Sequence, residues 1–112
     1  MQADSKKYLW DAQGACDLIS TFVAGKSMKS YVSDPMLRAA VERQLEIAGE
    51  ALGQFAKRDP ETATLIPELP RIVAFRNILI HGYATVDDSI VWAIVETKVP
   101  ALTEAIRRVL GE

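Results

Sequence analysis

Along most of the chain, apolar residues recur at three- and four-residue spacing, which is the spacing of residues on one face of an α-helix. The first such segment covers residues 8–23, and we expect the helix to stop at Gly25. A polar connection over residues 25–33 comes next. Asp34 and Pro35 then supply an N-cap carboxylate and a proline at the first helical position, which predicts the start of a second helix.

The second helix has an apolar stripe on one face, formed by Leu37, Val41, Leu45, Ala48, Leu52 and Phe55. Gly49 and Gly53 lie within the same helix. Both lower its helix propensity, but positions without a side chain allow a neighbouring helix to approach closely. Three prolines divide residues 57–70, which predicts a connection with room for about one helical turn.

A third helix is predicted from about residue 68 to His81, and Gly82 suits the position after its C-cap. Either Asp87 or Asp88 is expected to cap the last helix, because both stand just before its apolar pattern begins.

The last helix has an inward face formed by Val91, Val95, Val99, Leu102, Ile106 and Val109. Pro100 lies inside this pattern and should kink the helix. No segment alternates between apolar and polar residues as a half-buried strand would. We therefore predict an all-α fold, an antiparallel four-helix bundle with a kinked C-terminal helix, forming one domain over residues 1–112.

The third helix is apolar on more of its circumference than a bundle helix needs. Ile72, Phe75 and Leu79 point to one side, whereas Ala74 and Ile78 extend the apolar surface toward the other. A helix that is apolar nearly all round is buried nearly all round, and a bundle of this size has no helix at its centre. We therefore expect a second chain against this helix, most simply in a homodimer.

The composition and the absence of long apolar runs indicate in which compartment we expect the protein. The 112 residues are 49% hydrophobic and 25% charged, as in ordinary globular proteins, and no apolar run approaches the roughly 20 residues that span a bilayer. The first residues contain no apolar segment of a secretory signal, so we expect a cytoplasmic protein with no membrane partner. The single cysteine, Cys16, falls at an apolar helical position and is expected to be a reduced packing residue.

Charge and motif content exclude several kinds of site. A net charge of −2 gives no general attraction to nucleic acid, so any such site must be local. One histidine and one cysteine cannot assemble a usual zinc site, and there is no phosphate-binding glycine loop or nucleophile elbow. The glutamates at positions 42, 46 and 50 are expected to form a solvated face.

Four polar residues stand at the end of the third helix. Arg76 falls between apolar positions, where a salt bridge to another helix or a snorkelling side chain would each explain it. Asn77 and His81 are four residues apart and share a face, and His81 alone would suit the helix C-terminus. Tyr83 alone would be a packing residue.

Taken together, Arg76-Asn77-x-x-x-His81-x-Tyr83 resembles the signature of the HEPN superfamily, in its HepT-like toxin branch. The segments 41–52 and 86–92 strengthen the resemblance, which covers nearly the whole chain. It implies an all-helical homodimer whose two motifs meet at the interface. It also implies metal-independent endoribonuclease activity without a cofactor, with Arg76 and His81 catalytic and Asn77 supporting them.

The resemblance further implies a partner. Members of this branch pair with a small nucleotidyltransferase antitoxin, which transfers AMP to the motif tyrosine, here Tyr83, and so silences the toxin.

The residues suit such chemistry. His81 is the only side chain with an ordinary pKa near neutrality, and the Arg76 guanidinium can stabilise a phosphorane. The reaction needs both an acid and a base, which a dimer with two copies of His81 provides. On an ideal helix, however, the two residues diverge by roughly 140° and about 7.5 Å along the axis. Either the helix loosens before Gly82, or the arginine of one chain works with the histidine of the other.

Four further cations are candidates for RNA binding, the alternative being ordinary surface charge: Arg71, Lys98, Arg107 and Arg108.

Two alternative functions also remain open from the sequence. One is a non-catalytic helical partner that binds a nucleotidyltransferase or a nucleotide, and the other is a helical oligomerisation domain.

Overall fold

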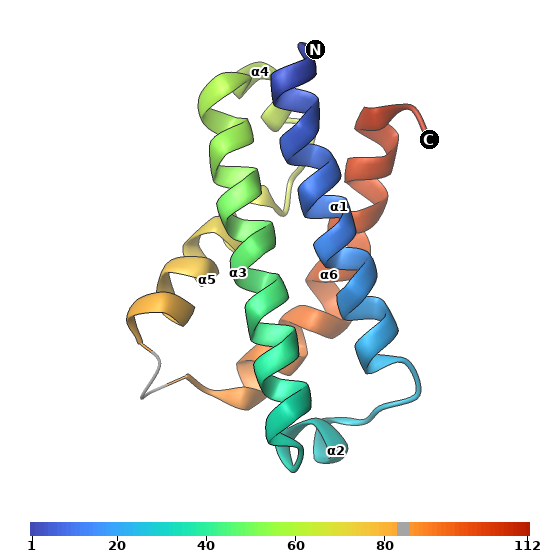
Figure 1. Cartoon of the computed structure of the whole chain (residues 1–112), viewed down its shortest axis with the longest axis vertical. Helices are drawn as coiled ribbons and strands as arrows, with labels where there is room; N and C mark the ends of the chain where they lie inside the picture. Colours follow the sequence, from blue (N-terminus) through green and yellow to red (C-terminus); the bar gives the residue numbers. More distant parts are fainter. Residues whose placement is uncertain (83–85) are drawn as a thin grey trace.

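The computed structural model describes residues 1–82 and 86–112. Within these ranges the chain forms only helices: α1 (Ala3–Val23), α2 (Met28–Val32), α3 (Pro35–Arg58), α4 (Pro60–Ala63), α5 (Leu69–His81) and α6 (Asp88–Leu110). The four long helices are those predicted from the sequence, and each runs opposite to the long helix before it (Figure 1). The prediction of an all-α antiparallel bundle is confirmed.

The connection between α1 and α3 is more ordered than its polar sequence indicated. Ser27 and Ser30 form a reciprocal capping box at the start of α2. Tyr31 is fully buried, and its ring lies 5.4 Å from that of Trp92 on α6. The expectation of a plain polar connection was therefore wrong, because one aromatic residue gives this short helix a place in the core.

Side-chain caps set the starts of two long helices. A carboxylate oxygen of Asp34 accepts hydrogen bonds from the N–H groups of the second and third residues of α3. Of the two candidates before α6, Asp87 is the N-cap, because its carboxylate accepts the backbone N–H of Ser89. α6 continues through Pro100 and changes direction along its length (Figure 1), as the proline predicted.

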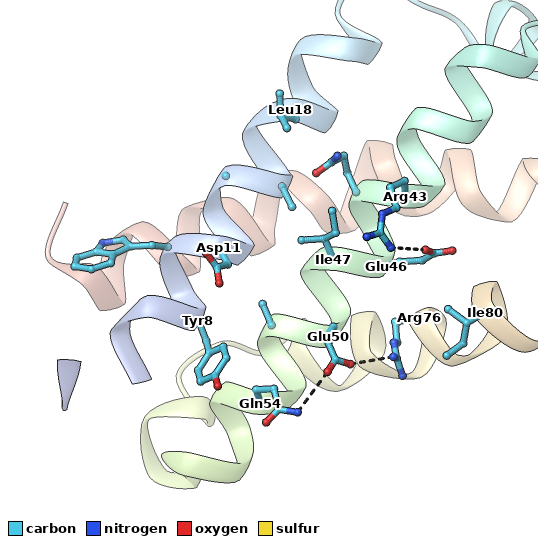
Figure 2. Close-up of a pocket in the computed structure, with 15 residues that line it drawn as sticks. Tyr8, Asp11, Leu18, Arg43, Glu46, Ile47, Glu50, Gln54, Arg76 and Ile80 are labelled. Carbon is cyan, nitrogen blue, oxygen red and sulfur yellow. Dashed lines mark hydrogen bonds and ion pairs between the residues drawn. The ribbon is translucent and has the colours of Figure 1, made fainter. Parts of the chain in front are cut away.

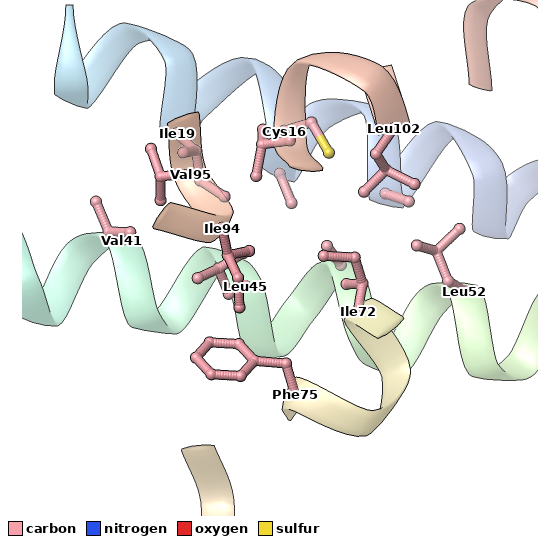
Figure 3. Close-up of a cluster of buried hydrophobic side chains, with 14 of the residues drawn as sticks. Cys16, Ile19, Val41, Leu45, Leu52, Ile72, Phe75, Ile94, Val95 and Leu102 are labelled. Atoms are coloured by element: carbon pink, nitrogen blue, oxygen red, sulfur yellow. The ribbon is translucent and has the colours of Figure 1, made fainter. Parts of the chain in front are cut away.

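The core lies where α1, α3, α5 and α6 meet (Figure 3). Every residue of the predicted α3 stripe is buried, and so is the predicted inward face of α6 except for partly buried Val109. Cys16 is fully buried, and the loss of solvation raises the pKa of its thiol to about 11. It is the packing residue that the sequence predicted.

α5 packs closely against α3 at Gly49. A Cβ atom at this position would come within 2.9 Å of Arg76 Cγ and 3.1 Å of the Ile72 carbonyl oxygen, so no other residue fits without moving α5. At Gly53 a Cβ atom would sit 3.9 Å from Val73, which is ordinary contact. Of the two glycines on α3, only Gly49 is needed for the close approach.

Candidate active site

Arg76 lies on the side of α5 that faces α3, with its guanidinium directed toward Glu50 (Figure 2). Oxygen atoms of two residues hold this guanidinium. Its Nη2 atom is 3.0 Å from Oε2 of Glu50 on α3. Its Nη1 atom donates a hydrogen bond of 3.2 Å to Oδ1 of Asn77 on the same helix. The side chain is 30% exposed. The salt bridge to another helix, one of the interpretations left open by the sequence, is therefore present, and the guanidinium is still reachable from solvent.

Glu50 is held in turn by Gln54, one turn further along α3. Gln54 Nε2 donates to Oε1 of Glu50 over 3.4 Å, so a chain of polar contacts runs from Gln54 through Glu50 and Arg76 to Asn77. Sequence reasoning assigned Glu50 to a solvated face and missed this contact. No spacing in the sequence could reveal it, because the partners belong to different helices; Gly49 was the only local sign of a close approach.

The other two glutamates of the row have different surroundings. Glu46 pairs with Arg43 at 3.2 Å, on the rim of the same region. Glu42 is partly buried, and this burial, together with the negative charges of Asp88 and Glu46, raises the pKa of its carboxyl. The row is therefore not one uniform solvated face.

His81 is exposed at the C-terminal end of α5. The helix is regular up to this point, since the Gly82 N–H donates to the Ile78 carbonyl oxygen over 2.7 Å. On such a helix, side chains five residues apart point roughly 140° from one another. The loosening before Gly82 that would bring the two together is not present. The structure therefore directs Arg76 and His81 of one chain toward different sides of α5.

The remaining motif residues are placed as follows. Asn77 is exposed, and it precedes His81 by one helical turn on the same face. Tyr83, the expected AMP acceptor, lies outside the described residues.

A cleft of about 850 Å³ opens between α1, α3 and α5 (Figure 2). Of the described motif residues, only Arg76 lines it. Arg43 is the other cation of the lining, and three carboxylates accompany them: Asp11, Glu46 and Glu50. Arg76 is therefore surrounded in the cleft by side chains of both charges, and the surface of the cleft is not uniformly positive.

The four further cations considered from the sequence have separate locations. Lys98, Arg107 and Arg108 each form an ion pair with a nearby carboxylate, at 3.8, 3.3 and 3.1 Å respectively. Arg71 is exposed on α5 and lines a smaller cavity of about 240 Å³ together with Ile78 and Ile90. None of the four lines the cleft that contains Arg76.

Two further features are absent from the described part of the chain, namely a metal-ligand cluster and a membrane-spanning helix. Among residues 1–82 and 86–112, no three His, Cys, Asp or Glu side chains are grouped so that they could hold a metal ion. No helix within these ranges is long and apolar enough to cross a bilayer.

Similarity to known proteins identifies the family. Residues 12–109 match the model of the family "Ribonuclease HepT-like". The chain is 34% identical to a Thermococcus cleftensis protein named "Probable ribonuclease HepT", over 91% of this chain and 92% of that protein. It is 31% identical to a Caldanaerobacter subterraneus protein named "Putative RNase TTE0752", over 94% and 93% of the two chains. No solved structure is significantly similar to it. The chain belongs to the HepT-like ribonuclease family of the HEPN superfamily.

Proposed function

We propose that this protein is an endoribonuclease that cleaves RNA without a metal ion and acts as the toxin of a toxin–antitoxin pair. One observation carries the proposal: α5 presents a solvent-reachable arginine, hydrogen-bonded to Asn77, and an exposed histidine at its C-terminal end. Membership of a ribonuclease family supports RNA as the substrate.

In the proposed reaction, the 2′-hydroxyl oxygen of the substrate attacks the adjacent phosphorus. One His81 takes the proton of that hydroxyl as general base. The bond from phosphorus to the 5′ oxygen breaks, and a second His81 donates a proton to this oxygen as it leaves. Arg76 stabilises the charge that accumulates on the phosphorane oxygens. The products are a 2′,3′-cyclic phosphate and a free 5′-hydroxyl.

The second histidine comes from a second copy of the chain. Because α5 is regular through His81, Arg76 and His81 of one chain leave the helix roughly 140° apart. A two-fold dimer brings a second Arg76 and a second His81 to the same cleft, so that each group in the reaction has two possible sources. One chain also has an exposed apolar surface for a dimer contact, since Ile78 on α5 and Ile90 on α6 are 53% and 49% exposed around the smaller cavity.

Silencing would act through Tyr83, two residues after His81. A nucleotidyltransferase antitoxin would transfer AMP to its phenol oxygen. The added group brings bulk and negative charge to the place where an anionic substrate must bind, so binding would fail for both reasons.

RNA cleavage by the purified protein in EDTA tests the nuclease. We expect cleavage by the wild type and none by His81→Ala, with 2′,3′-cyclic phosphate ends on the products. If both proteins leave identical RNA patterns, the nuclease proposal fails. The alternative, a non-catalytic partner of a nucleotidyltransferase, predicts harmless expression, whereas the toxin predicts growth arrest that requires both Arg76 and His81.

A further inference from the structure

Glu50 lies outside the Arg76–Tyr83 motif, yet it makes the closest ionic contact to the motif arginine, at 3.0 Å. We propose that Glu50 is a positioning residue, which orients the guanidinium of Arg76 toward the phosphate of the RNA substrate. This inference rests on the proposed ribonuclease function.

The stem of Arg76 is already restricted by α3. Its Cβ and Cγ atoms lie against the backbone at Gly49, where a Cβ atom would not fit. What remains free is the rotation of the outer bonds that carry the guanidinium. Glu50 and Asn77 remove this freedom by accepting from two different nitrogens, Nη2 and Nη1. An arginine has five N–H donors, so the fixed group keeps donors for a phosphate.

Glu50 has a contact of its own, which a positioning residue requires because its side chain is 53% exposed. Gln54 donates to its second carboxylate oxygen from one turn further along α3. Two contacts, of 3.4 and 3.0 Å, therefore connect α3 to the guanidinium through Glu50. Without Glu50, the guanidinium would sample several rotamers around the same Cβ position.

Orientation and charge have opposite effects on the substrate, and this separates the proposed role from a structural one. A loose guanidinium still attracts RNA as a cation, but it meets the phosphorane oxygens less often. The Glu50 carboxylate also repels the phosphate. Removing Glu50 should therefore lower both kcat and KM, whereas partial unfolding would lower the active fraction and leave KM unchanged.

The chain provides a matched control on the same helix. Glu46 lines the same cleft one turn earlier and pairs with Arg43 instead of Arg76. Glu46→Ala removes the same charge from the cleft but leaves the guanidinium of Arg76 in place.

The experiment compares kcat and KM for RNA cleavage in the wild type, Glu50→Ala, Glu50→Gln and Glu46→Ala. We expect Glu50→Ala to lower kcat about 10- to 100-fold, the range for a misplaced catalytic group. Glu50→Gln keeps an acceptor oxygen and should recover most of kcat, with a KM below that of the wild type. Equal losses of kcat in Glu50→Ala and Glu46→Ala, or no recovery in Glu50→Gln, would overturn the role.

A measurement without RNA keeps this inference separate from the nuclease proposal. The 15N order parameter of the Arg76 Nε–H group reports how firmly the guanidinium is held. We expect it to fall in Glu50→Ala and to stay at the wild-type value in Glu46→Ala. A protein that shows this fall but cleaves no RNA would remove the nuclease proposal alone. An active wild type whose Arg76 order parameter is unaffected by Glu50→Ala would remove the positioning role alone.

Discussion

Gly49 of α3 lies directly against the side chain of Arg76 on α5. A Cβ atom at Gly49 would approach Arg76 Cγ to 2.9 Å and the Ile72 carbonyl oxygen to 3.1 Å. The proposed catalytic arginine therefore starts at a point where α5 lies too close to α3 for a side chain on α3. The packing of α5 against α3 and the position of Arg76 therefore both depend on the lack of a side chain at Gly49.

Replacing Gly49 by alanine should destabilise the bundle, because α5 must move away from α3. Overpacking of this kind costs about 1–3 kcal/mol of unfolding free energy. Gly53→Ala is the matched control: its Cβ atom would meet Val73 at ordinary contact distance, so helix propensity should stabilise the protein by up to about 1 kcal/mol. Urea denaturation of both variants tests this, and equal midpoints would contradict the close approach.

Replacing Arg76 by alanine should remove RNA cleavage but change stability little. The ion pair with Glu50 is partly exposed, and such pairs contribute about 1 kcal/mol or less. Loss of a donor to the phosphorane costs about 100-fold or more in kcat. Cleavage assays and thermal denaturation of the same preparation measure both. A wild type that cleaves no RNA, together with a large loss of stability in Arg76→Ala, would instead support a helical oligomerisation domain. Arg43→Ala is the control for charge in the cleft.

Replacing Ile78 by glutamate should prevent dimer formation, because it places a charge in the exposed apolar surface of α5. Ile78 is 53% exposed in the single chain, so the substitution should leave the hydrophobic core of each protomer intact. Sedimentation velocity at micromolar concentration measures the mass. Leu65→Glu, at a residue 62% exposed outside α5, should leave the dimer intact. A wild-type protein that sediments as a monomer would rule out the composite site.

Mixing the wild type with His81→Ala tests whether one site needs two chains. The proposed reaction uses both copies of His81, so a heterodimer of the wild type and His81→Ala lacks either the base or the acid. After subunit exchange in an equimolar mixture, RNA cleavage should therefore fall to about half of its value before exchange, because half of the wild-type chains enter mixed dimers. Cleavage that does not fall on exchange would show that one chain suffices for the reaction.

Replacing Glu42 by glutamine should raise stability at neutral pH. Burial and the charges of Asp88 and Glu46 raise the pKa of the Glu42 carboxyl, so its ionisation opposes folding. With a raised pKa in the folded state, the wild type regains this stability as the pH falls toward the ordinary value of 4.5. The advantage of Glu42→Gln should therefore be present at pH 7 and disappear in acid. Denaturation curves between pH 4 and pH 7 measure the difference, and an advantage that grows in acid would contradict the sign.

The sequence by itself determined the long helices and the motif. The stripe on α3, the cap at Asp34 and the stop after His81 depend on local spacing and on side chains that bond to nearby backbone, whereas the choice of Asp87 over Asp88 came from the structure. Such signals are complete within a few residues, so they can be identified without the fold. The spacing of Arg76, Asn77 and His81 is local in the same sense, and it pointed to the family that the comparisons confirm.

Only the tertiary structure decided what lies against these elements. Glu50 meets Arg76, Tyr31 enters the core beside Trp92, and Gly49 rather than Gly53 carries the contact between α3 and α5. Each of these depends on how far one helix is rotated and shifted against another. Many side chains set that rotation and shift together through close packing, so no short stretch of sequence contains it. The motif residues are local to one helix, but the residue that holds the arginine belongs to another.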